Sequence, residues 1–253
     1  GLLLVALILI CHGTVLAETN SCTTCHSILE TGGREHKAFV DWKGSVHARE
    51  GVACDACHGG DRSEPLYADA HRGILGASDP RSPIHAYTIP ATCGECHQPQ
   101  LKEFQRSRHF LLLRTDEREL RAPTCVTCHG AMHTTVLSPA AVADQCRLCH
   151  NSESRLLPHI PGEAHATLSL IFYAQTTIQW SEEFLAAARK QGHDVSKATD
   201  ALKEAEVRFR YSKIKWHSFN FPEILRMVDG AYEAAKRAKE LAAREVRRVE
   251  KEE

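Results

Sequence analysis

One short pattern, Cys-x-x-Cys-His, occurs five times between residues 22 and 150 of this chain. Ten of the eleven cysteines belong to it, and in every copy a histidine directly follows the second cysteine. Zinc sites and structural disulfides also use cysteine pairs, but neither requires that histidine. The pattern is typical of c-type haem attachment, in which both thiols bind the porphyrin and the histidine ligates the iron.

The attachment residues can be read directly from the five copies. The cysteines predicted to bind the porphyrins are Cys22, Cys25, Cys54, Cys57, Cys93, Cys96, Cys125, Cys128, Cys146 and Cys149. The histidines predicted to bind iron from the proximal side are His26, His58, His97, His129 and His150. We therefore expect five haem c groups, each with one iron.

Composition divides the chain into two regions. Residues 18–162 are rich in glycine, proline and turn-forming residues and show no sustained helical or strand period. We expect this segment to be a loop-rich pentahaem domain whose core is its cofactors and which is unstable without them. In residues 163–253 the pattern instead predicts long helices over 163–190, from Asp194 or Ser196 to about 216, and from 220 onward. The predicted fold is mainly α, with a C-terminal bundle of long antiparallel helices.

The start of the chain has the features of an export signal. Residues 2–10 form an unbroken apolar run, and Val15-Leu16-Ala17 has the form of a cleavage site. We expect residues 1–17 to be the latter part of a signal that is removed before Glu18, and the protein to be periplasmic or extracellular. The alternative is an uncleaved membrane anchor, although the run is shorter than the ~20 residues that a spanning helix needs.

Two segments of the chain repeat each other. The spacing from Cys22 to Cys54 equals that from Cys93 to Cys125, at 32 residues. Within each segment a phrase of the form aromatic-x-x-Ser-x-His precedes the second motif, at residues 42–47 and 104–109. The sequence predicts a duplicated two-haem unit with a fifth motif added after it.

A six-coordinate haem needs a second axial ligand, and eleven histidines lie outside the motifs. One of them is in the predicted signal, and only two methionines are present, so we expect low-potential haems with two histidine ligands. Position relative to the motifs and to the repeated phrase favours four histidines, and two in the helical region are candidates for the fifth place. These distal candidates are His47, His85, His109 and His133, followed by His165 and His217. His36 and His71 are the alternatives.

The repeated phrases and the Cys-His-Gly endings of two motifs, at Gly59 and Gly130, resemble multihaem cytochromes related to hydroxylamine oxidoreductase and pentahaem nitrite reductase. Residues 216–223, which lead into an alanine-rich helix, are similar to the helical end of that superfamily. The resemblance implies closely packed haems, a helical C-terminal domain and a role in periplasmic nitrogen or sulfur redox metabolism. In that nitrite reductase family the active haem is attached through Cys-x-x-Cys-Lys, whereas all five motifs here end in histidine.

A formal charge of -1 gives no nucleic-acid signature. We predict an electron-transfer protein that passes electrons along closely packed haems to redox partners, either a membrane quinol dehydrogenase or other cytochromes. The first alternative is an oxidoreductase that acts on a small nitrogen or sulfur compound at one five-coordinate haem. The second is a subunit of a haem-stacked oligomer or filament, and the C-terminal helices are the candidate surface for a homo-oligomer.

Overall fold

The computed structural model describes residues 20–115, 122–154, 156–249 and 251. These residues form thirteen α-helices and one short 3-10 helix, without a strand, so the predicted mainly α fold is confirmed. None of the described helices is both long and apolar enough to cross a membrane. The predicted export signal, residues 1–17, lies outside the described residues.

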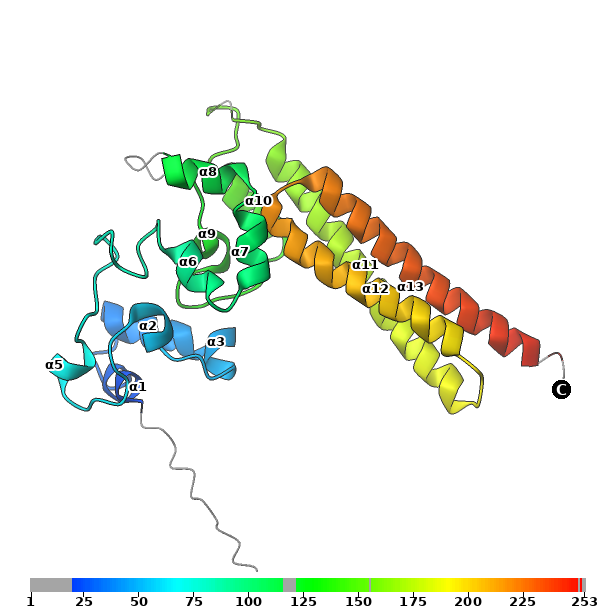
Figure 1. Ribbon diagram of the computed structural model, residues 1–253, viewed down its shortest axis with the longest axis horizontal. Coiled ribbons are helices and arrows are strands. Elements are labelled where there is room, and N and C mark those ends of the chain that lie inside the picture. Colours follow the sequence, from blue (N-terminus) through cyan, green and yellow to red (C-terminus); the bar gives the residue numbers. More distant parts are fainter. Residues whose placement is uncertain (1–19, 116–121, 155, 250, 252–253) are drawn as a thin grey trace, which may run out of the picture.

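The first part of the chain is a series of short helices joined by turns (Figure 1). They are α1 (Ser21–His26), α2 (Arg34–Lys43), α3 (Val46–Arg49), α4 (Asp55–His58), α5 (Tyr67–Ala70), α6 (Ile89–Gly94), α7 (Gln98–Phe104), α8 (Arg108–Thr115), α9 (Cys125–His129) and α10 (Pro139–Arg147). Among the described residues, this region contributes only five buried hydrophobic residues: Ala53, Phe104, Leu113, Val142 and Ala143. Side chains alone therefore supply a small core here.

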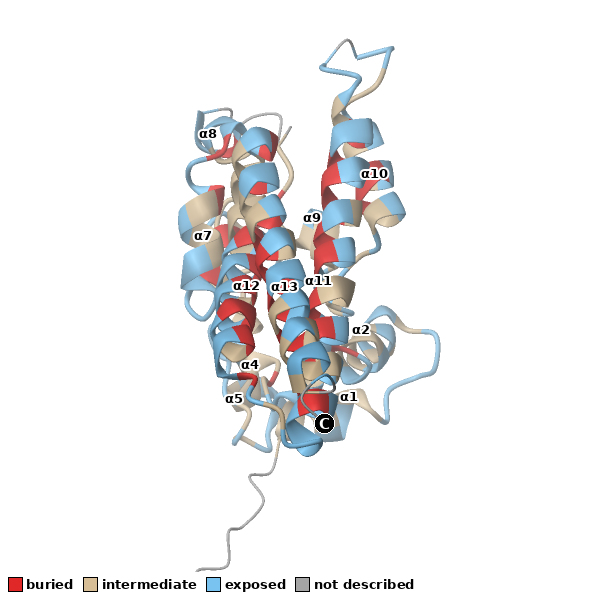
Figure 2. Ribbon diagram, turned by 90° about the vertical axis from the view of Figure 1, so that its right-hand side faces the viewer, coloured by how far each residue is buried: buried red, intermediate tan, exposed pale blue. Residues whose placement is uncertain are grey.

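Three long helices follow: α11 (Ile160–Lys190), α12 (Ser196–Lys215) and α13 (Phe221–Val249). They pack along one another in an elongated bundle, and the 3-10 helix η1 (Trp216–Ser218) links α12 to α13 (Figure 1). Their buried residues face inward and form the hydrophobic core of the molecule (Figure 2). The bundle thus provides a rigid side-chain core next to the region of short helices.

The ends of these helices differ slightly from the sequence-based expectation. The first begins at Ile160, three residues before the predicted start, with a proline in its first turn, where the missing amide is tolerated. The second begins at Ser196, one of its two predicted starts, because the Asp194 carboxylate accepts a hydrogen bond from the Ser196 amide (3.0 Å) ahead of the helix. The third begins after Asn220, whose side chain accepts from the Glu223 amide (3.3 Å), as predicted for that capping sequence.

Small residues form the inner face of α13. Ala231, Ala234, Ala235 and Ala238 are completely buried, so the neighbouring helices approach its backbone closely. The hydroxyl of Ser181 on α11 donates to the Ala235 carbonyl (2.9 Å), which bonds the two helices directly. A larger side chain at these positions would have no space without movement of a helix.

The bundle also contacts the region of short helices. Val142 on α10 belongs to the hydrophobic core of the bundle, and α7 packs against both η1 and α12. Lys215, at the end of α12, pairs with Glu103 on α7 (3.0 Å) and with Glu223 on α13 (2.9 Å). The Lys215 and Glu103 side chains are only 12% and 14% exposed, so this is a largely desolvated contact between the two regions.

Candidate haem-binding sites

Each Cys-x-x-Cys-His motif lies on a turn of helix. In three copies the histidine amide donates to the carbonyl of the first cysteine, as shown by His58 to Cys54 (2.9 Å), His97 to Cys93 (2.9 Å) and His150 to Cys146 (2.8 Å). Residues three and four positions apart lie on the same face of such a turn. Both thiols and the imidazole are therefore on one side of the backbone, which is the arrangement that a porphyrin with an iron ligand needs.

Consecutive motifs lie next to one another in chain order. The interacting thiols of neighbouring copies are Cys22 with Cys54, Cys57 with Cys93, Cys93 with Cys125, and Cys128 with Cys146. Burial, together with the neighbouring thiol, raises the pKa of Cys54 and of Cys128 to about 11. The five motifs therefore form one series in which each lies near the next, and Cys93 and Cys125 are joined by a hydrogen bond.

Four of the five proximal histidines face a second histidine at nearly constant spacing. The pairs, with ring-centroid distances, are His26–His71 (6.2 Å), His47–His97 (6.1 Å), His109–His150 (6.1 Å) and His129–His217 (6.2 Å). Two imidazoles bound on opposite sides of one metal ion, with bonds of about 2 Å, have centroids about 6 Å apart. The spacing fits an iron between the two rings of each pair.

The repeated phrase folds in the same way at both of its positions. The Ser45 amide donates to Trp42 (2.8 Å) and the Ser107 amide to Phe104 (2.9 Å). Each buried serine hydroxyl then accepts an amide hydrogen bond three residues later, from Ala48 (3.2 Å) and Phe110 (3.1 Å) respectively, and so caps the next short helix. This places His47 and His109 at equivalent points of the first turn. His47 faces His97 of the third motif, and His109 faces His150 of the fifth.

Hydrogen bonds orient most of the paired rings. The Nδ1–H groups of four imidazoles donate to backbone carbonyls: His71 to Tyr67 (2.8 Å), His129 to Thr135 (3.0 Å), His150 to Leu156 (2.8 Å) and His217 to Ile214 (3.0 Å). Thr134 Oγ1 lies 3.1 Å from Nδ1 of His47. A bond from Nδ1–H to a carbonyl selects the tautomer whose Nε2 lone pair is free for a metal. The donor set thus fits haem iron.

Burial keeps several of these imidazoles uncharged. It lowers the pKa of His47, His58 and His217. Burial, together with a smaller effect of the nearby His150 ring, lowers the pKa of His109 to about 4, because two imidazolium charges would repel each other. The neutral form is the one that binds a metal, so no proton has to be displaced from these rings at pH 7.

The structure places three of the six predicted distal candidates, His47, His109 and His217, opposite a proximal ring. It also places His71 there, which the sequence favours less. The segment after the second motif returns to α1, where the Ser21 amide and hydroxyl both donate to the Arg62 carbonyl (2.9 Å each). This return brings His71 to His26, and no local pattern around His71 signals it.

The other three distal candidates have different surroundings. The buried His85 ring packs against Tyr87, 4.9 Å between centroids. His133 is exposed and donates from Nδ1 to the Asp41 carbonyl (3.2 Å), while His165 is exposed on α11. Within the part of the chain that the structure describes, none of them faces a proximal ring at the common spacing, and no histidine ring faces His58 in that way.

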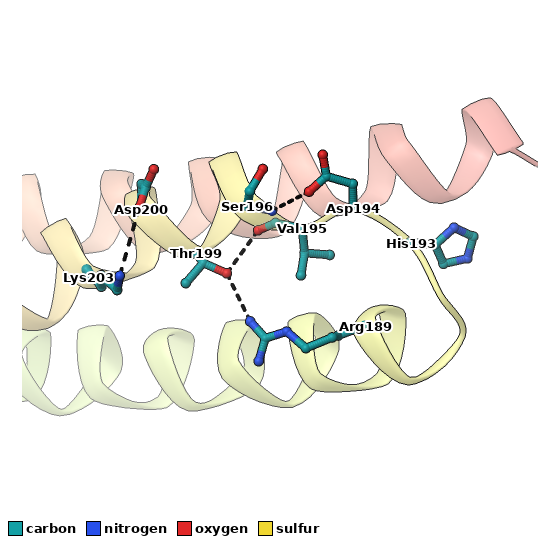
Figure 3. A pocket seen from close by; sticks show the side chains of 8 residues that line it. All are labelled: Arg189, His193, Asp194, Val195, Ser196, Thr199, Asp200 and Lys203. Atoms are coloured by element: carbon teal, nitrogen blue, oxygen red, sulfur yellow. Dashed lines mark hydrogen bonds and ion pairs between the residues drawn. The ribbon is translucent and has the colours of Figure 1, made fainter.

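A surface pocket lies around the turn between α11 and α12, at the end of the bundle away from η1 and the paired histidines (Figure 3). Its lining includes Arg189, which donates to Thr199 Oγ1 (3.1 Å), and Lys203, which pairs with Asp200 (4.0 Å). Both basic side chains therefore have a partner within the lining. The 20 residues of α12, roughly 30 Å of helix, separate the pocket from η1 and the paired histidines.

A comparison with protein-family models supports the interpretation of the Cys-x-x-Cys-His motifs as haem attachment sites. Residues 80–151 match the family model described as "Cytochrome c7 and related cytochrome c". The matched segment contains the third, fourth and fifth motifs and one copy of the repeated phrase. No curated protein and no solved structure matches the chain. The family match supports a multihaem c-type cytochrome with covalently bound haem c.

Proposed function

We propose that this chain is an exported electron-transfer protein that carries five haem c groups, most of them with two histidine ligands. The observation that carries the proposal is the set of four histidine pairs at 6.1–6.2 Å, arranged along motifs that follow one another in space in chain order. A haem iron supplies a one-electron ferric–ferrous couple when it is bound. Closely spaced iron sites with unchanging ligands are suited to moving electrons rather than to binding a substrate.

The residues of the chain have distinct parts in this function. The cysteines hold the porphyrins, and the pairs His26–His71, His47–His97, His109–His150 and His129–His217 hold four of the irons. Hydrogen bonds that the Nδ1–H groups of four of these rings donate to carbonyls keep those rings in a constant orientation, so little reorganisation accompanies a change of charge at the metal. Most of these imidazoles are partly buried, which lowers the local dielectric, whereas His97 is exposed.

Partner proteins would exchange electrons where the sites reach the surface. Cys25 of the first motif, Cys96 of the third and Cys149 of the fifth are exposed. A porphyrin attached at these cysteines would therefore have an edge near solvent, at both ends and in the middle of the series. We infer that a redox protein, a membrane quinol dehydrogenase or another cytochrome, donates at one end and that a second one accepts at the other.

One observation favours a second candidate function. His58 has no opposing histidine ring at the common spacing among the described residues, so its iron is the candidate for an open coordination position. The resemblance to hydroxylamine oxidoreductase and pentahaem nitrite reductase would then extend to chemistry on a small nitrogen or sulfur compound at that iron. Such chemistry also requires acid–base groups nearby.

Low-temperature EPR of the purified ferric protein tests the choice between the two functions. Total haem is measured in parallel by the pyridine haemochrome assay, which also counts haems per chain. Five low-spin haems support electron transfer alone. One high-spin haem that shifts on addition of nitrite or hydroxylamine, and that is lost in a Cys54→Ala, Cys57→Ala variant, supports the enzyme. Fewer than five haems per chain would contradict the proposed attachment sites.

A further inference from the structure

Residues 215–219, which comprise the end of α12, η1 and the residue after it, reach into the haem region. They supply His217 to the pair with His129, and Lys215 to the ion pair with Glu103. The last of them, Phe219, has φ +54°, a left-handed conformation that is uncommon for a bulky residue. The contacts of the surrounding structure hold that backbone in place.

The Phe219 ring packs directly on a proposed iron ligand. Its centroid lies 4.7 Å from that of His109, with the planes at 79°, so one ring presents its edge to the other. Phe104 and Trp216 border Phe219 in turn, at 6.5 Å and 6.2 Å. This aromatic cluster belongs partly to the haem region and partly to the bundle.

His109 differs from the other proposed distal ligands in how its ring is oriented. Its Nδ1 is buried and has no hydrogen-bond partner, whereas the Nδ1 groups of His71 and His217 donate to carbonyls, and that of His47 lies beside a threonine hydroxyl. No hydrogen bond therefore opposes rotation of the His109 ring about its Cβ–Cγ bond. The orientation of the His109 ring is instead restrained by its packing against the Phe219 ring.

The rings of this pair are also crossed. The planes of His109 and His150 form an angle of 62°, the largest of the four pairs. The angle is 47° for His47 and His97, 25° for His26 and His71, and 20° for His129 and His217. When the two imidazole planes are parallel, the π orbitals of both ligands raise the energy of the same iron dπ orbital, so the two dπ orbitals dxz and dyz differ strongly in energy. When the imidazole planes are crossed, each ligand raises a different dπ orbital, and the two orbitals are closer in energy. The angle therefore determines the EPR anisotropy of a ferric low-spin haem.

We propose that Phe219 is a positioning residue that holds His109 crossed to His150 and thereby makes the haem at Cys146 and Cys149 electronically distinct from the haems whose two histidine rings are nearly parallel. The inference rests on the proposed histidine pairing. An Nδ1 without an acceptor also makes His109 a weaker donor to iron than a hydrogen-bonded imidazole. Both effects favour the ferrous state, so this haem has a higher reduction potential than the one between His129 and His217, whose rings are both hydrogen-bonded.

Two variants of Phe219 test the proposal with EPR and a spectroscopic redox titration. Phe219→Leu keeps an apolar side chain, and Phe219→Gly removes the ring while easing the left-handed backbone, so a folded and fully loaded protein is expected from at least one. In both, the most anisotropic low-spin signal shifts to lower g, while the remaining signals are unchanged. Phe172→Ala, at an exposed phenylalanine of α11, is the matched control and leaves every signal in place.

The outcomes separate this proposal from the proposed function. Unchanged signals and potentials in both fully loaded Phe219 variants would overturn the positioning role alone. His109→Ala should convert one low-spin haem to high spin and remove the most anisotropic signal. If His109→Ala leaves all haems low-spin, His109 is not a ligand, and both the pairing and the role of Phe219 are overturned.

Discussion

The imidazole of His217 lies nearly parallel to that of His129, with 6.2 Å between centroids and 20° between planes, although 88 residues separate them. His217 belongs to η1, and its Nδ1 donates to Ile214 at the end of α12 (3.0 Å). The helical bundle therefore contributes a candidate iron ligand as well as a side-chain core. Haem binding at the fourth motif would join the two regions through the metal.

Replacing His217 by alanine should convert one haem from low spin to high spin, because no other described histidine ring lies opposite His129 at the common spacing. The measurement is EPR of the ferric protein together with the visible spectrum, normalised to haem content. His165→Ala is the control, since that side chain is exposed on α11 and faces no proximal ring. A fully loaded His217→Ala protein without a high-spin signal would remove His217 from the ligand set.

The helix caps formed by the serines of the repeated phrase should contribute measurably to the free energy of unfolding. Ser45→Ala and Ser107→Ala each remove a buried hydroxyl that accepts an amide hydrogen bond, so each should lower the free energy of unfolding by about 1 kcal/mol. Denaturant unfolding of the holoprotein, followed by far-UV circular dichroism, measures the loss. Serine-to-threonine variants keep the acceptor and should recover part of it. Equal stability of the alanine variants and the wild type would show that the caps are not needed.

The Lys215 ion pairs should stabilise the protein in a pH-dependent way. Lys215→Met removes charge-assisted hydrogen bonds to Glu103 and Glu223, and it should lower the free energy of unfolding by about 2 kcal/mol at pH 7. The hydrogen bond from Lys215 lowers the pKa of Glu223 below its ordinary value of 4.5. A depressed carboxyl pKa stabilises the folded state above pH 4.5, and the effect is lost as the pH falls through the folded-state value.

The difference in stability between wild type and Lys215→Met should therefore be constant near neutral pH and decrease below pH 4.5. Comparing the two proteins cancels the effects of acid on the haem ligands, which they share. Arg244→Met is a matched control, because its pair with Glu240 (3.7 Å) is mostly exposed. A stability difference that does not change with pH would show that Glu223 is not the partner that matters.

Overpacking the alanine face of α13 should destabilise the bundle. Ala235→Leu adds a branched side chain at a completely buried position beside Ser181, and we expect a loss of about 1–3 kcal/mol in the free energy of unfolding. Thermal unfolding monitored at 222 nm measures it. Lys239→Leu, on the exposed face of the same helix, should change stability by less than about 0.5 kcal/mol. A similar loss in both variants would indicate an effect unrelated to packing.

Local features of the sequence were enough to predict much of this protein. The helical bundle follows from periodicity and from capping residues such as Asn220, because both act within a few residues of the chain. The candidate attachment cysteines and proximal histidines follow from the motif, since one helical turn brings positions three and four apart to the same face. The two serine phrases also fold alike, as their repetition suggests.

The pairing of the histidines was decided by the tertiary structure. His71 reaches His26 because the segment after the second motif returns to α1, and His217 reaches His129 because α12 and α13 meet beside the haem region. His133 lies four residues after a proximal histidine, yet it faces Asp41 instead. A metal ligand must lie on the opposite side of the porphyrin from its partner. Residues close in sequence rarely satisfy that condition, so the distal ligands depend on long-range packing that local patterns do not encode.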